Sequence, residues 1–131
     1  MKSLLGTLRR PDLIFRANGL FDITARVVRA LHISPGDVVD VLSDGREYYL
    51  YVARHAANAP HARFEAQVFP SNRQGSGQHF RGSSTRLCKA ILSICNVNGR
   101  VALSCGEVTN DHLGRLLIPI ITRHPLTGAT D

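Results

Sequence analysis

The chain has 131 residues, 44% of them hydrophobic, which predicts a single domain, residues 1–131, whose core needs no disulfide or metal to support it. Its 16 basic and 10 acidic residues give a formal net charge of +6, which favours nucleic acid or another polyanion as a partner. No apolar run approaches the roughly 20 residues of a membrane-spanning helix, and three cysteines without a Cys-x-x-Cys pair indicate reduced thiols, so we expect a cytoplasmic protein that contacts no membrane.

The first part of the chain predicts short strands interrupted by one helix. Apolar alternation and β-branched residues indicate four strands, at 13–16, 20–23, 38–42 and 47–53. Apolar residues at helical spacing predict a helix over 25–32, with Thr24 as its N-cap. The helix is expected to end before Pro35, which cannot continue it.

The second part of the chain repeats this pattern after a linker, which we place at 56–62. Four further strands are predicted, at 63–69, 79–81, 100–104 and 116–122. A second helix is expected over 85–92, capped by Ser83 or Ser84. Pro119 lies inside the last strand, which favours an edge or a bulge at that position.

The two parts also share short sequence matches. Residues 45–55 and 114–124 both read as a Gly-Arg turn, an apolar strand and an Arg-His end, and residues 26–31 match 86–91. Such matches indicate one supersecondary unit used twice, so we expect one repeat at about 12–55 and another at about 63–124.

The expected fold is mainly β with two short helices, arranged as a closed pseudo-twofold barrel built from two β-β-α-β-β repeats. Closure would remove the exposed strand edges. Both a swapped-hairpin and a double-psi barrel fit this pattern. Two separate lobes are disfavoured, because each half has one helix and too little core to stand alone.

The stretch from Ile23 to Val41, with its Pro35-Gly36-Asp37 turn, resembles the AbrB/SpoVT family of swapped-hairpin, cradle-loop barrel transcription regulators. The resemblance covers about 12–54 and, more loosely, 63–123. In that family two copies of the unit interlace, usually from two chains, so a tandem duplication in one chain implies a single-chain pseudo-dimer. The resemblance also implies DNA binding and transcription regulation, with contacts at positions that correspond to Arg16, Arg29, Arg81 and Lys89.

Basic residues cluster before and on the two expected helices, and they could form one positive face if the halves pair. This set comprises Arg9, Arg10, Arg16, Arg26, Arg29, Arg63, Arg73, Arg81 and Arg86. The alternative is a set of arginines scattered over a solvated surface. The nucleic-acid contacts that we predict are Arg16, Arg29, Arg81, Arg86 and Lys89, with DNA favoured over RNA.

Catalysis has little support in the sequence, and an enzyme on a double-psi-type barrel is the least favoured of the three hypotheses. The sequence has no Gly-x-Ser-x-Gly, dinucleotide-binding or paired-carboxylate motif, and its six histidines lack metal-site spacing. We therefore expect no catalytic residues, no cofactor, no metal and no small-molecule substrate. The alternative to nucleic-acid binding is a non-enzymatic module for protein interaction or oligomeric assembly, in which a homo-oligomer is the functional form.

Overall fold

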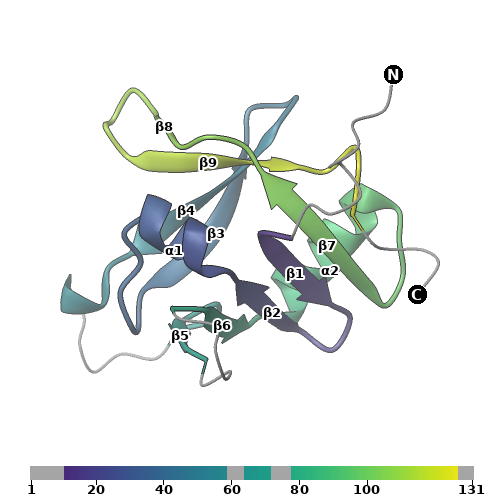
Figure 1. Ribbon diagram of the computed structural model, residues 1–131, viewed down its shortest axis with the longest axis horizontal. Helices are drawn as coiled ribbons and strands as arrows, with labels where there is room; N and C mark the ends of the chain where they lie inside the picture. The colour runs from purple at the N-terminus through teal and green to yellow at the C-terminus, as the bar shows by residue number, and fades with distance from the viewer. Residues whose placement is uncertain (1–10, 59–63, 72–77, 127–131) are drawn as a thin grey trace.

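The computed structural model describes residues 11–58, 64–71 and 78–126 and is mainly β with two helices (Figure 1). In chain order the elements are β1 (Leu13–Arg16), β2 (Leu20–Ile23), α1 (Ala25–Ala30), β3 (Val38–Ser43), β4 (Tyr48–Arg54), a 3₁₀ turn (Ala56–Asn58), β5 (Val68–Pro70), β6 (Phe80–Ser83), α2 (Thr85–Cys95), β7 (Arg100–Cys105), β8 (Thr109–Asn110) and β9 (Leu116–Ile121).

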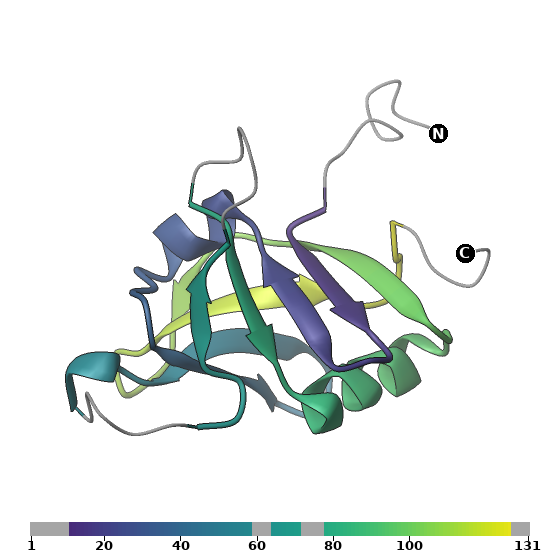
Figure 2. The ribbon, with the colours of Figure 1, turned by 90° about the horizontal axis from the view of Figure 1, so that it is seen from below.

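The strands form one curled antiparallel sheet in the order β3-β4-β9-β7-β1-β2-β6-β5, with β8 paired to β9 (Figure 2). Within the described segments, the two end strands meet at an isolated bridge between Val38 and Gln67. The sheet is therefore a curled half-barrel, and the expectation of a closed barrel is wrong. The physical reason is that β5 has three residues and the chain before it turns at Ala66, whose φ is 62°.

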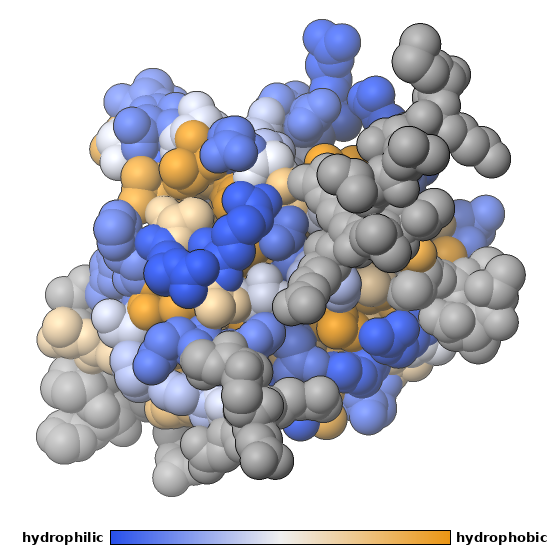
Figure 3. All heavy atoms as spheres, viewed as in Figure 1, coloured by the Kyte–Doolittle hydropathy of each residue, from blue (hydrophilic) through white to orange (hydrophobic). Residues whose placement is uncertain are grey.

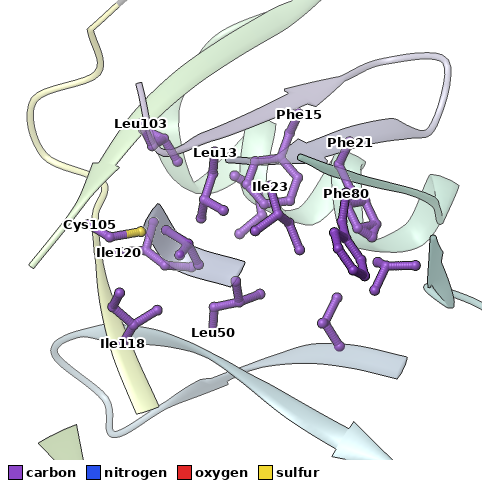
Figure 4. Close-up of a cluster of buried hydrophobic side chains, with 14 of the residues drawn as sticks. Leu13, Phe15, Phe21, Ile23, Leu50, Phe80, Leu103, Cys105, Ile118 and Ile120 are labelled. Atoms are coloured by element: carbon purple, nitrogen blue, oxygen red, sulfur yellow. The ribbon is translucent and has the colours of Figure 1, made fainter. Parts of the chain in front are cut away.

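The concave side of the sheet holds the hydrophobic core (Figure 4). Successive side chains of a strand point to opposite faces, so the strands of the main sheet path contribute one face to this interior, whereas both residues of β8 are exposed. The largest fully buried side chains include Leu13, Phe15, Phe21, Ile23, Leu50, Phe80, Leu103 and Ile118. Packing is closest at Gly82, where an added Cβ would lie 2.6 Å from the Phe21 ring and 2.8 Å from Val68. The neighbouring strand and ring thus require a glycine there.

The two helices lie far apart on different sides of the curled sheet (Figures 1 and 2), and α2 contacts β1, β2 and β7. Helix α1 buries Val27 and Val28, and α2 buries Cys88, Ile91 and Leu92. Both helices begin at the predicted residue. The first ends earlier than expected, at Ala30, with His32 following in the left-handed region. The second runs three residues past the predicted end, to Cys95, where left-handed Asn96 terminates it.

The two halves are unequal, so the structure does not show two matching repeats. Helix α1 has six residues and α2 has eleven, and β8 has no counterpart in the first half. The strand predicted at 63–69 is reduced to Val68–Pro70, because Ala66 leaves the extended conformation.

Pro119 lies in β9, which is flanked by other strands rather than at a sheet edge. It stands opposite Tyr49 of β4, where the neighbour on the other side of β9 changes from β7 to β8. Gly106, in the connection between those two strands, donates its N–H to the Pro119 carbonyl. Proline has no N–H to donate, and Pro119 lies between the part of β9 that pairs with β7 and the part that pairs with β8. Few strand hydrogen bonds are therefore lost.

Candidate nucleic-acid interface

Four neighbouring strands place three arginines and one aspartate on the same face of the sheet. Arg100 of β7 stands opposite Arg16 of β1, and Asp22 of β2 stands opposite Arg81 of β6. Ile14, two residues before Arg16, stands opposite Asp22 and so shares its face. Because directly opposed residues project to the same side, these charged residues lie on the convex side, away from the buried phenylalanines. We call Arg100, Arg16, Asp22 and Arg81 the arginine row.

Asp22 holds two of these arginines at once. Its Oδ2 lies 2.8 Å from Nη2 of Arg16, and its Oδ1 accepts a 2.8 Å hydrogen bond from Nε of Arg81. The Asp22 side chain is 12% exposed. Burial raises its pKa, but the hydrogen bonds and charges of Arg81 and Arg16 outweigh burial and hold the pKa below its ordinary value. The carboxylate therefore stays ionised, and the three charges sum to one positive charge.

Arg16 is the more enclosed of the two arginines. Its Nη1 atom is buried and finds no hydrogen-bond partner within the described part of the chain. Arg81 is more open, with about a third of its side chain exposed, and its pKa is raised by the hydrogen bond to Asp22. The orientation of both guanidinium groups is thus fixed by one carboxylate.

An exposed aromatic residue extends the arginine row to the end of the sheet. Phe69 of β5 stands directly opposite Arg81, and 51% of its surface is exposed. A large exposed aromatic side chain beside arginines is typical of surfaces that stack nucleic-acid bases and contact phosphates.

The other predicted contact residues lie elsewhere. Arg29 is exposed on α1, and Lys89 is exposed on α2, which lies away from α1 in both views (Figures 1 and 2). Figure 3 shows strongly hydrophilic side chains gathered over α1, beside hydrophobic ones. Arg86, at the start of α2, donates 2.7 Å and 3.1 Å hydrogen bonds to Glu65 while 88% of its side chain stays exposed. Of the five predicted contacts, Arg16 and Arg81 are therefore the pair that the fold joins through a shared partner.

The remaining members of the basic set contribute little to a described positive face. Arg26 donates to both carboxylate oxygens of Asp12 and to the Cys105 carbonyl. The hydrogen bond to Asp12 raises the pKa of Arg26. Four members lie outside the described residues: Arg9, Arg10, Arg63 and Arg73. The described segments hold eleven basic and nine acidic residues, so most of the +6 surplus belongs to the rest of the chain.

Sequence reasoning missed Arg100, Phe69 and the role of Asp22. The alternation in residues 100–104 puts Arg100 on the face opposite Val101, but it does not say which strand lies beside it. The pairing of Asp22 with Arg81 joins residues 59 positions apart. A local sequence pattern does not indicate which residue of a distant strand stands opposite a given residue.

Other chemistries find less support. In the described segments no group of three or more His, Cys, Asp or Glu side chains could hold a metal ion. Burial raises the pKa of the Cys88 and Cys95 thiols, which makes them poor nucleophiles. Nδ1 of His55 lies 3.5 Å from Oδ2 of Asp37, too long for a firm hydrogen bond.

The Asp37 carboxylate instead stabilises the turn after α1. It accepts 2.8 Å hydrogen bonds from the backbone N–H groups of Ser34 and Ala56. The Pro-Gly-Asp motif that the sequence singled out thus has a structural role in joining that turn to the end of β4.

Comparisons with family models, with curated proteins and with solved structures found no match. The resemblance to the AbrB/SpoVT family stays a prediction from the residues around the Pro35-Gly36-Asp37 turn. Among the described residues, no helix is long and apolar enough to cross a membrane.

Proposed function

We propose that the protein binds nucleic acid, with DNA as the favoured target, through the convex face that carries the arginine row and Phe69. The observation that supports this proposal is the Arg16–Asp22–Arg81 cluster, which fixes two guanidinium groups on one sheet face beside an exposed aromatic ring. In this proposal the arginines contact phosphates and Phe69 stacks against a base. Asp22 holds the guanidinium groups in place before the ligand arrives.

We also propose that the chain arose by duplication and that its role is regulatory, as the AbrB/SpoVT resemblance implies. The pairing scheme supports duplication. Let the strands of the first half, β1 to β4, correspond in order to β5, β6, β7 and β9. The β1–β2 pair then corresponds to β5–β6, and the β3–β4 pair corresponds to β7–β9. The β2–β6 and β4–β9 pairs then each join corresponding strands.

Two ion pairs also support duplication. Arg26, the second residue of α1, binds Asp12, which precedes β1. Arg86, the second residue of α2, binds Glu65, which lies before β5. In each half, therefore, an arginine in the first turn of the helix holds an acidic residue that precedes the first strand.

Fluorescence anisotropy with labelled DNA tests the binding proposal. The full chain is titrated into a 20-nucleotide single strand, and into the corresponding duplex, at about 50 mM and about 200 mM salt. Removing one phosphate contact makes the dependence of log K on the logarithm of the salt concentration shallower, by about 0.7 for a single strand and about 0.9 for a duplex. We expect Arg81→Gln to weaken binding about tenfold and to lower the slope. The expected result for Phe69→Ser is a larger loss for the single strand than for the duplex, because a duplex does not offer an unstacked base.

Arg46→Gln is the matched control, since it removes one positive charge from an exposed turn between β3 and β4. It should change affinity less than twofold. Equal losses in Arg46→Gln and Arg81→Gln would show that only total charge matters and would overturn this site. Absence of binding to both DNA forms at low salt would overturn the function.

A protein-interaction module is the second candidate function. The observation that favours it is the outer edge of β3, which contacts the segment before β5 at Val38 and Val39 and has no partner strand beyond Val39 within the described residues. An unpaired strand edge beside an apolar surface is a template for another chain.

A further inference from the structure

The half-barrel stays open between β3 and the segment that leads into β5, and we call this open side the seam. The backbone of β3 is exposed there. Val39 uses its N–H on the seam side to bond the Ala66 carbonyl, which marks the end of pairing with the β5 segment. Two residues further on, the Val41 N–H is accepted by the Asp40 side chain at 2.7 Å rather than by another strand. Because alternate residues of an antiparallel strand point their backbone groups to the same side, Val41 and Ser43 present theirs to the seam.

A groove of about 490 Å³ runs along this edge, between β3 and α2. Val39 and Val41 line it from the strand, and Leu87, Ile91 and Ile94 line it from the helix. Ile94 is 37% exposed, which is unusual for a large apolar side chain on a helix that packs against a core. The groove therefore combines an apolar wall with backbone groups of β3 that no other described strand pairs, and a strand added there takes the place of the Asp40 side chain at the Val41 N–H.

The charged side chains that line the groove sum to one negative charge, in a chain whose overall charge is positive. Arg86 lies 2.7 Å from Glu65, so these two charges compensate each other. Asp40 is exposed on the same groove, and its described hydrogen bond goes to the backbone of its neighbour Val41. Arg86 also interacts electrostatically with Asp40, so the three charges together leave one net negative charge for a positively charged ligand.

We propose that β3 binds an extended segment of a partner protein by strand addition. The segment pairs with residues 40–43, a length of roughly 13 Å at about 3.3 Å per residue. It carries apolar residues at alternate positions, which enter the groove, and a lysine or arginine that faces Asp40. This site is separate from the arginine row, so it does not depend on nucleic-acid binding.

The charge on Asp40 distinguishes this partner from a second copy of the chain. Antiparallel pairing of two β3 edges would bring the two Asp40 carboxylates to the same narrow interface. Like charges across a strand pair are destabilising. A basic segment instead gains an ion pair at the same place.

The test uses a fluorescein-labelled, end-capped peptide of alternating lysine and valine, six residues long, and an alternating glutamate and valine peptide of the same length. Anisotropy with the full chain at about 150 mM salt should show binding of the lysine peptide and at least tenfold weaker binding of the glutamate peptide. Backbone amide signals of Val41, Leu42 and Ser43 should shift on addition of the lysine peptide. Equal binding of both peptides, or shifts confined to other strands, would overturn the proposal.

A pair of variants on α2 tests the groove itself. Ala90→Arg fills the groove from an exposed position, whereas Ser93→Arg adds the same charge to another exposed position outside the groove lining. We expect Ala90→Arg to weaken binding of the lysine peptide at least tenfold, and Ser93→Arg to weaken this binding less than twofold. Asp40→Lys should abolish the preference for the lysine peptide.

Light scattering across a range of protein concentrations identifies the competing occupant. A monomer at all concentrations supports the proposal. A dimer that Ala90→Arg dissociates and Ser93→Arg preserves would show that a second copy fills the groove, which would overturn a peptide partner.

Discussion

At the scale of single residues, Asp22 is the charge that organises the outer face of the sheet. It is enclosed on β2 and contacts Arg16 from the neighbouring β1 and Arg81 from the neighbouring β6. The two guanidinium groups compensate for the burial of the carboxylate, and the carboxylate limits the repulsion between the two guanidinium groups. The stability of this part of the sheet therefore depends on the ionisation of one side chain.

Replacing Asp22 by asparagine should lower the free energy of unfolding at pH 7 by about 1.5–3 kcal/mol, the range for hydrogen bonds to charged groups. The amide keeps the size of the side chain but leaves two guanidinium groups without an anion. Urea unfolding followed by circular dichroism measures the change. Glu107→Gln, at an exposed position, is the control and should change the free energy of unfolding by less than about 0.5 kcal/mol.

The same variant should alter the dependence of stability on pH. The pKa of Asp22 is lower in the folded protein than in the unfolded chain. Its contribution is therefore fully present above the ordinary aspartate pKa and is lost as the pH falls through the folded value. The unfolding free energy of Asp22→Asn should fall less steeply below about pH 4 than that of the parent. If the unfolding free energies of the two proteins fell equally steeply as the pH is lowered, a stabilising role for this carboxylate would be contradicted.

At the scale of elements, the two helices begin in different ways. The Ser84 hydroxyl accepts the Leu87 N–H at 3.0 Å and donates to Glu65 at 2.6 Å, so it caps α2 and joins it to the β5 segment. Thr24, at the start of α1, makes no side-chain cap bond, and its hydroxyl donates to the Asp12 carbonyl. The two cap positions thus look alike in sequence but are unlike in bonding.

This difference predicts unequal effects of removing the two hydroxyls. Ser84→Ala should cost about 1 kcal/mol of stability, the usual value for a lost helix N-cap. Thr24→Val should cost less, because no N–H in the first turn of α1 loses a side-chain acceptor. Thermal unfolding compares the two variants, and an equal or larger loss in Thr24→Val would contradict this account of the caps.

At the scale of the whole molecule, the open seam decides which parts of the sheet are protected. The central strands β7, β1 and β2 have neighbours on both sides, whereas β3 has a continuous partner in β4 alone among the described strands. Sheet curvature brings the two ends close enough for one bridge but not for a ladder. Among the described strands, β3 therefore presents backbone groups to solvent along the open side of the half-barrel.

Hydrogen exchange followed by NMR should reveal this side as an alternation within one strand. The amide of Val39, bonded to Ala66, and that of Leu42, which faces β4, should exchange slowly. The amide of Val41 should exchange much faster, because its acceptor is an exposed side chain. Uniform protection along β3 would show instead that the barrel is closed in solution.

Most element positions could be predicted because their signals are local. The first two strands are confirmed at their predicted bounds, and the next two lie within one residue of them. Gly19 joins the first pair with a positive φ of 93°, a conformation that favours glycine. The largest error concerns residues 63–69, where alternating apolar residues suggested a strand but left-handed Ala66 interrupts it.

By itself, the sequence determined where the chain extends, coils and turns, because these choices depend on neighbouring side chains and on glycine and proline. It also placed Arg16 and Arg81 on strands among the expected contact residues. The tertiary structure alone decided that these two arginines share Asp22, that Phe69 stands beside Arg81, and that the barrel stays open along β3. Strand order and register fix those relations, and they arise from packing between residues far apart in the chain.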